Sequence, residues 1–144
     1  MADVLLDVKD LVIHYETDDG VVQALNGVNL QILSGKTLGL VGETGAGKTT
    51  LAKGIMQLIP NPPGKIKSGE IWYNGNDLLK KNKEDMRKIR GREISMIFQD
   101  PMTALNPVMT VREQIMEVIL QHNNVNKEEA GKRADHMLEL VGIP

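Results

Sequence analysis

The sequence predicts an α/β protein with an antiparallel β subdomain, a partial parallel sheet around a glycine-rich loop, and a pair of helices near the C-terminus. Two strand-like segments joined by a turn fill residues 4–33. A short apolar run at 37–41 leads into a glycine-rich segment and a helical pattern, and residues 110–142 carry two capped helical patterns. The predicted parts of the chain are residues 1–36, 37–100 and 101–144.

Composition limits the classes of function. The chain has 144 residues, of which 41% are hydrophobic and 25% charged, and these values are typical of one soluble globular domain. Its net charge of -2 favours neither nucleic acid nor an anionic membrane surface as a partner. Because there is no cysteine, no disulfide and no cysteine-ligated metal can form within these residues. No apolar run approaches the roughly 18 residues that span a bilayer, and we expect a cytoplasmic protein.

The first quarter of the chain is rich in strand patterns. Val4 to Tyr15 mixes alternating and continuous apolar positions, which is typical of one or two strands. Glu16 to Gly20 predicts a turn, and Val21 to Leu33 alternates imperfectly around a predicted tight turn at Asn26-Gly27. Strands joined by short turns favour an antiparallel sheet. At the end of the first strand, the flat ring of Tyr15 suits stacking on a purine base, while a half-buried strand-end tyrosine is the plainer interpretation.

A glycine-rich segment carries the clearest functional signal. Residues 42–49 (GETGAGKT) fit G-x-x-x-x-G-K-[ST], the phosphate-binding loop, with every fixed position filled. Thr37 to Val41 before it predicts a buried strand, and Thr49 to Ile59 after it predicts a helix. This order suits phosphate binding, because backbone N–H groups at a helix N-terminus attract an anion. Lys48 would then reach the β- and γ-phosphates, and the Thr49 hydroxyl would bind Mg²⁺.

Downstream of this loop, predicted loops, strands and helices alternate. Pro60 to Gly64 predicts a rigid loop, and Glu70 to Tyr73 predicts a short strand. The basic stretch Lys80 to Arg92 predicts a short solvated helix with one apolar edge. Ile94 to Phe98 predicts a second buried strand, and Gln99 follows it at the position where open α/β sheets bind ligands.

Two helices close the sequence. The first begins at a capping box, Thr110-Val111-Arg112-Glu113, and the second begins near Asn126. Gly142 is a natural stop for the second helix. Apolar residues at helical spacing predict the buried face of each helix, namely Val111, Ile115, Val118 and Ile119 in the first, and Ala130, Ala134, Met137, Leu138 and Val141 in the second.

Two motifs together resemble a known family. Residues 42–50 (GETGAGKTT) and 97–107 (IFQDPMTALNP) strongly resemble the nucleotide-binding subunits of ATP-binding-cassette (ABC) transporters. The second motif is similar to the branch that energises dipeptide, oligopeptide and nickel importers, and the resemblance covers nearly all 144 residues. It implies a P-loop NTPase fold of the ABC type and a transport ATPase that couples ATP binding and hydrolysis to uptake of peptides or a related solute.

The resemblance also implies roles for the residues that match the family's motifs. Tyr15 matches the aromatic position that stacks on adenine, and Lys48 matches the lysine that acts on the phosphates. Thr49 and Gln99 match Mg²⁺ ligands, and Gln99 also matches the residue that contacts the attacking water, so Lys48 and Gln99 are the expected catalytic residues. The expected nucleotide-binding residues are Tyr15, Gly42, Glu43, Thr44, Gly45, Ala46, Gly47, Lys48, Thr49 and Thr50.

The family's partners follow from the same resemblance. ATP and Mg²⁺ would be the cofactors. The loop after Gln99 and the helices from Thr110 onward would contact transmembrane permease subunits, and a second nucleotide-binding subunit would complete the assembly. The resemblance therefore implies a protein on the inner face of the cell membrane, with no nucleic-acid partner.

The sequence also departs from the family's pattern. A complete subunit continues with a signature motif, an acidic motif after a further strand, and a switch histidine, and none of these is present. His14, His122 and His136 do not follow buried strands as the switch histidine should. We therefore expect the N-terminal part of one nucleotide-binding domain, whether a truncated gene product, an engineered fragment or a proteolytic one. Such a chain should bind nucleotide weakly and hydrolyse it hardly at all.

Two other functions compete with this interpretation. One is a stand-alone nucleotide-binding or interaction module without hydrolysis, and the other is a small P-loop kinase. A kinase would need an arginine-rich lid and a second substrate pocket, which the basic segment at 80–92 does not supply. A GTPase is disfavoured, because the N-K-x-D match at residues 82–85 lies in a charged helical segment and not after a strand.

Overall fold

Two long strands organise the first part of the chain. The computed structural model describes residues 3–100 and 102–144, and in it β1 (Val4–Thr17) pairs antiparallel with β2 (Gly20–Leu33). β3 (Gly64–Tyr73) pairs with the other side of β1, and β4 (Asn76–Asp77) pairs with β3. The strand order is therefore β2-β1-β3-β4, which confirms the predicted antiparallel β subdomain.

The tight turn predicted inside the second strand is wrong. β2 runs without interruption through Asn26 and Gly27. Val12 of β1 pairs with Asn26 while Leu11 pairs with Val28, so Gly27 is an extra residue, and its φ is 84°. This is a β-bulge, in which one strand absorbs an additional residue and the ladder continues. An Asn-Gly pair produces the same sequence signal in a bulge and in a hairpin turn.

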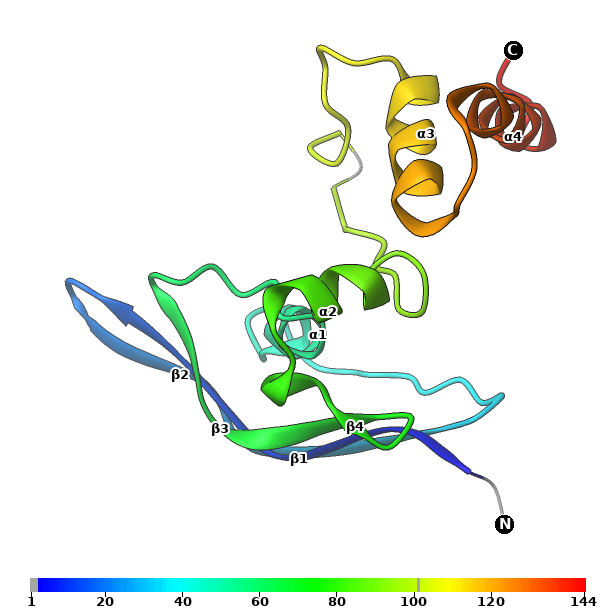
Figure 1. Cartoon of the computed structure of the whole chain (residues 1–144). Coiled ribbons are helices and arrows are strands. Elements are labelled where there is room, and N and C mark those ends of the chain that lie inside the picture. The colour runs from blue at the N-terminus through cyan, green and yellow to red at the C-terminus, as the bar shows by residue number, and fades with distance from the viewer. Residues whose placement is uncertain (1–2, 101) are drawn as a thin grey trace. The chain divides into compact units, whose positions relative to one another are not determined.

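One face of the sheet holds the core of this part of the chain. β1 buries alternate residues, and Leu11 and Ile13 are fully covered. α1 (Lys48–Ile55) lies over this face (Figure 1), and its buried residues are Leu51 and Gly54. A Cβ atom on Gly54 would lie 2.6 Å from Cδ1 of Ile13, so the absence of a side chain there allows the helix to approach β1 closely. Met86 of α2 (Lys83–Ile89) is also buried, which confirms the apolar edge predicted for the basic helix.

The predicted partial parallel sheet does not form among the described residues. Neither 37–41 nor 94–98 is a strand, and Arg90 and Ile94 form an isolated parallel bridge. Val41 and Ile97 are 96% and 99% exposed. A strand needs a neighbour for its N–H and C=O groups, and an apolar pattern indicates a preference for burial without supplying that neighbour.

The last part of the chain is a helical pair, as predicted. The chain falls into two units, Met1–Arg87 and Lys88–Pro144, and the second contains α3 (Val111–His122) and α4 (Lys127–Leu140). Both predicted N-caps are confirmed, because Thr110 accepts a hydrogen bond from the Glu113 N–H and Asn126 accepts one from the Glu129 N–H. Pro101, within the predicted motif at residues 97–107, lies outside the described residues.

Burial in the helical pair is lower than predicted. Ala130 and Ala134 are fully buried, but Met137 and Val141 are 54% and 69% exposed. No described residue of α3 is buried, so its predicted apolar face is covered only in part. Helical spacing predicts which residues share a face, whereas the coverage of that face depends on what packs against it. The predicted burial of Met137 and Val141 is therefore wrong.

Candidate functional site

The glycine-rich loop runs directly into α1. Gly45 and Gly47 have φ values of 83° and 91°, and Gly47 is the N-cap of the helix. The first helical hydrogen bond runs from the Leu51 N–H to the Gly47 carbonyl, at 2.8 Å. A Cβ atom on Gly47 would lie 2.9 Å from both the Ala24 carbonyl oxygen and Cδ2 of Leu25. Gly47 is therefore required both for its left-handed backbone and for the close approach of the loop to β2.

The start of α1 has the features of an anion site. N–H groups in the first turn of a helix have no partner inside the helix, and here these belong to Lys48, Thr49 and Thr50. No side chain caps this helix start, and its first turn holds no acidic residue. The N–H of Ala46, by contrast, already donates to the Glu43 carbonyl at 3.0 Å. The predicted phosphate-binding position therefore offers the free N–H groups and the positive helix end that a phosphate needs.

Lys48 folds back onto the loop that precedes it. Its Nζ donates to the carbonyl oxygens of Gly42 and Glu43, at 2.5 and 2.6 Å. A Cβ atom on Gly42 would lie 3.7 Å from both Cδ and Nζ of Lys48, so the side chain passes close over the backbone. The ammonium group is thus held beside the loop by two neutral acceptors. A phosphate oxygen is a stronger acceptor for it, because charge-assisted hydrogen bonds exceed neutral ones.

Tyr15 and Thr50 meet beside this loop. Their hydroxyl oxygens lie 3.3 Å apart, and both residues are half-buried. Tyr15 comes from the end of β1, and Thr50 from the first turn of α1. The structure therefore joins the residue predicted to stack on adenine with another residue predicted to bind the nucleotide. Thr49, the predicted Mg²⁺ ligand, is exposed in the same helical turn.

Next to Tyr15, a charged cluster lies on the sheet. The carboxylate of Glu16 accepts from Nζ of Lys65 at 2.5 Å and from Nζ of Lys67 at 3.1 Å. The hydrogen bond from Lys65, and then that from Lys67, lower the pKa of Glu16 below its ordinary value. Glu16 therefore stays ionised next to the predicted base site. Within the described residues, no group of three or more His, Cys, Asp or Glu side chains is placed to hold a metal ion.

Gln99 belongs to the other unit of the chain. It is exposed and lies in an irregular segment, where the Asp100 carboxylate accepts a hydrogen bond from the Met102 N–H at 3.0 Å. The predicted buried strand before it is wrong, as described above. The structure therefore brings Tyr15, the loop and Thr50 together, and the role of Gln99 at the nucleotide stays a prediction.

One neighbour of Tyr15 was not predicted from the sequence. Gly64 is buried, and β3 begins there, six residues before the predicted strand. A Cβ atom on Gly64 would lie 2.9 Å from the Pro60 carbonyl oxygen and 3.1 Å from Cε1 of Tyr15. The signal was present as the glycine that closes the proline-rich loop, but its partner lies far away in the sequence. Only the pairing of β1 with β3 brings Gly64 against the tyrosine ring.

Comparison with known proteins supports the motif. The family model described as "ABC transporter" matches residues 25–144. The oligopeptide transport ATP-binding protein OppD of Bacillus subtilis (strain 168) is 54% identical over 140 residues, which are 97% of this chain and 39% of the relative. OppD of Escherichia coli (strain K12) is 46% identical over 143 residues, which are 99% of this chain and 42% of the relative. The chain thus spans about two fifths of the length of these relatives.

Solved structures agree on the fold. A dimeric structure of MJ0796, a bacterial ABC transporter cassette, matches with a TM-score of 0.79 and 26% identity, over 96% of this chain and 58% of that one. The same cassette in a dimeric post-hydrolysis state, bound to ADP and Pi, matches with a TM-score of 0.78 and 23% identity over the same shares. The chain therefore has the ABC ATPase fold over part of that fold's length.

Within this chain, no helix of the described residues combines the length and the hydropathy that crossing a bilayer requires. The family model covers more than half of the sequence, including the whole phosphate-binding loop and α1. The fold, the loop and the relatives agree, and the chain belongs to the ABC transporter family.

Proposed function

We propose that this chain is the ATP-binding part of a subunit that powers peptide uptake. The observation that carries the proposal is the glycine loop at the start of α1, with Lys48 held over its backbone and Tyr15 beside Thr50. Relatives named as oligopeptide and dipeptide transport ATP-binding proteins support the solute class, because they are 54% and 44% identical to nearly the whole chain.

Each residue of the site has a distinct task in this proposal. The first-turn N–H groups of α1 and the Lys48 ammonium bind the phosphates, and the Tyr15 ring binds the adenine. The Thr49 hydroxyl, exposed in the first helical turn, fits a Mg²⁺ ligand, since oxygen donors suit this hard cation. When bound, Mg²⁺ supplies positive charge to the phosphates. Gln99 is proposed as the second protein ligand and the contact to the attacking water.

Partners and activity belong to the same proposal. We infer that the loop after Gln99 and the helices α3 and α4 contact permease subunits at the inner face of the membrane. A second nucleotide-binding subunit is proposed because the matched cassette forms a dimer. The 144 residues contain one phosphate-binding loop and no recognisable acidic motif. We therefore propose that this chain, by itself, hydrolyses ATP far more slowly than the roughly 1 per second of an ordinary enzyme.

Calorimetric titration with ATP and Mg²⁺ tests the nucleotide site. Lys48→Ala should weaken ATP and pyrophosphate binding about 10- to 100-fold, because a hydrogen bond to a charged group contributes about 1.5–3 kcal/mol. Lys53→Ala, in the last turn of the same helix, is the matched control and should bind as the wild type does. Equal affinities for the Lys48→Ala variant and the wild type would refute the proposed phosphate site.

A further inference from the structure

The hydroxyl contact between Tyr15 and Thr50 has a role beyond base stacking. These residues are 35 positions apart, and the contact is partly buried. Stacking on a base needs only the ring of a tyrosine, and phenylalanine would serve equally well. Base stacking therefore does not account for the 3.3 Å contact between the two hydroxyl oxygens.

A glycine of β3 leaves room for the tyrosine ring. Gly64 is paired with Tyr15 across the sheet and is buried. A Cβ atom on Gly64 would overlap Cγ2 of Ile59 and would lie 3.1 Å from Cε1 of Tyr15. In addition, the Glu16 N–H donates to the Pro63 carbonyl at 2.8 Å, which ties the end of β1 to the proline-rich loop. The backbone next to the ring is thus tied to the proline-rich loop, Gly64 leaves room for the ring edge, and the hydroxyl lies beside that of Thr50.

Hydrogen-bond chemistry shows what this hydroxyl can do. A threonine hydroxyl has one proton to donate and can also accept, whereas a phosphate oxygen at neutral pH only accepts. A threonine hydroxyl in a helix can also donate its hydrogen bond to a backbone carbonyl of the preceding turn. If the Tyr15 hydroxyl donates to Oγ1 of Thr50, the threonine proton is left for the phosphate. Such a chain of hydrogen bonds also strengthens each of its members.

We propose that Tyr15 is a positioning residue for phosphate, acting through Thr50. In the complex, the Tyr15 hydroxyl donates to Oγ1 of Thr50, and Thr50 donates to a phosphate oxygen of the ligand. This inference rests on the proposed nucleotide site and deepens it. Its consequence is specific: the tyrosine hydroxyl should contribute to the binding of a ligand that has no base at all.

Three substitutions, made singly and in combination, and two ligands test the relay. Tyr15→Phe keeps the aromatic ring and removes its hydroxyl. Thr50→Val removes the threonine hydroxyl and keeps a side chain of similar shape. Calorimetry with pyrophosphate and with ATP, at fixed Mg²⁺, should show about three- to tenfold weaker binding of both ligands by Tyr15→Phe. The Tyr15→Phe/Thr50→Val double variant should bind no more weakly than Thr50→Val alone, because each change breaks the same relay. Thr50→Ser, which keeps a hydroxyl, should restore the sensitivity to Tyr15→Phe.

The controls separate the possible outcomes. Tyr73→Phe, another tyrosine on the same sheet, should leave both affinities unchanged. If Tyr15→Phe binds pyrophosphate as the wild type does, the relay is refuted while the nucleotide site stands. The same holds if Tyr15→Phe reduces the affinity as much in the Thr50→Val background as in the wild type. If the wild type binds neither ligand, the proposed function itself fails, and the relay fails with it. Unfolding midpoints without ligand show whether a variant has merely lost its fold.

Discussion

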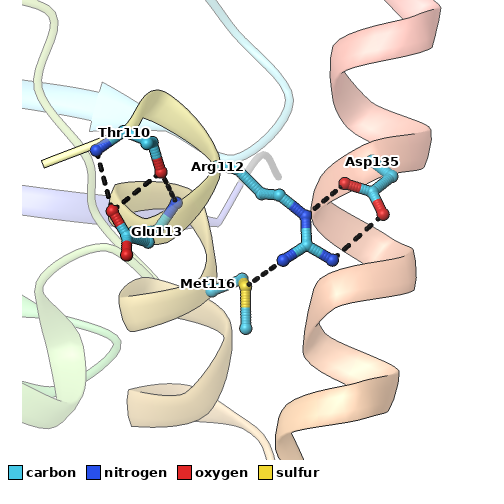
Figure 2. Close-up of polar contacts among 5 residues, drawn as sticks. All are labelled: Thr110, Arg112, Glu113, Met116 and Asp135. Atoms are coloured by element: carbon cyan, nitrogen blue, oxygen red, sulfur yellow. Dashed lines mark hydrogen bonds and ion pairs between the residues drawn. The ribbon is translucent and has the colours of Figure 1, made fainter.

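The guanidinium group of Arg112 on α3 makes a two-point contact with the carboxylate of Asp135 on α4 (Figure 2). Nε lies 2.5 Å from Oδ1 and Nη2 lies 3.1 Å from Oδ2, while Nη1 donates to the sulfur of Met116 at 3.4 Å. Hydrogen bonding to Arg112 lowers the pKa of Asp135, and the same contact raises the pKa of Arg112. Both side chains are about half exposed, so solvent screens the pair and the pair contributes little to stability.

Gly131→Ala should break this contact without a loss of stability. A Cβ atom on Gly131 would overlap Nη2 of Arg112 and lie 3.2 Å from its Cζ, so the flexible arginine must swing away. Alanine stabilises a helix interior by about 1 kcal/mol relative to glycine. Because the exposed ion pair contributes little, the unfolding midpoint in urea should stay equal or rise, and the pKa of Asp135 should return toward its ordinary value by NMR titration.

Gly142→Ala is the contrasting control for that experiment. Gly142 has a φ of 73° with no atom within 4 Å of a built Cβ, so only backbone strain opposes the substitution. It should destabilise the chain by about 1–2 kcal/mol. If Gly131→Ala lowers the free energy of unfolding as much as this control does, the arginine side chain cannot move away from the new Cβ atom.

Stability should fall in acid because of lowered carboxyl pKa values. Asp135 is shifted below its ordinary 3.8 by the hydrogen bond from Arg112, and Glu113 is shifted below its ordinary 4.5 by the N–H and then the hydroxyl of Thr110. In the folded state these groups bind protons more weakly than in the unfolded chain. Their contribution is therefore complete above the ordinary values and is lost as the pH falls through the folded values.

Thermal unfolding followed by circular dichroism at a series of pH values checks this sign. The midpoint temperature should stay constant between about pH 7 and pH 5, and it should decrease once the pH is lower than about 4. Asp135→Asn and Glu113→Gln should each make the acid decline shallower. A midpoint that instead falls as the pH rises from 5 to 7 would contradict the assignment.

Gly47→Ala should destabilise the chain more than Gly45→Ala. Both glycines have left-handed backbones, with φ values of 91° and 83°, and each substitution should cost about 1–2 kcal/mol for that reason. A Cβ atom on Gly47 would also meet the Ala24 carbonyl at 2.9 Å, whereas one on Gly45 would meet nothing within 4 Å. The backbone carbonyl cannot rotate away, so about 1–3 kcal/mol is added for overpacking at Gly47 alone. Urea unfolding of the two variants measures the difference in their free energies of unfolding. Equal destabilisation by both substitutions would show that the loop does not pack on β2.

The chain should self-associate through its unpaired apolar segments. Val41 and Ile97 are almost fully exposed and lie in segments with strand-like sequences, and these segments pair with no strand within residues 3–100 and 102–144. Exposed strand-like backbone is a template for association. Light scattering over a range of concentrations should show association, and Val41→Ser/Ile97→Ser should reduce it. Val118→Ser, at a residue 51% exposed on α3, is the control and should have a smaller effect, because helical backbone is already paired.

Local features of this protein were predictable from its sequence. The phosphate-binding loop, the helix after it, the antiparallel strands of residues 4–33 and the caps at Thr110 and Asn126 all depend on residues close together in the chain. A capping side chain bonds an N–H three residues away, and a glycine at a helix start needs only its own backbone freedom. Such signals are complete within a few residues.

Features that need a distant partner were decided by the tertiary structure. The segments 37–41 and 94–98 have the composition of buried strands, but no strand pairs with them among the described residues. In the same way, Met137 shares a predicted apolar face and yet is half exposed, and Tyr15 meets Thr50 only because α1 packs on the sheet. Strand pairing and side-chain burial each require two segments in contact, and the sequence of one segment specifies only its own side of that contact.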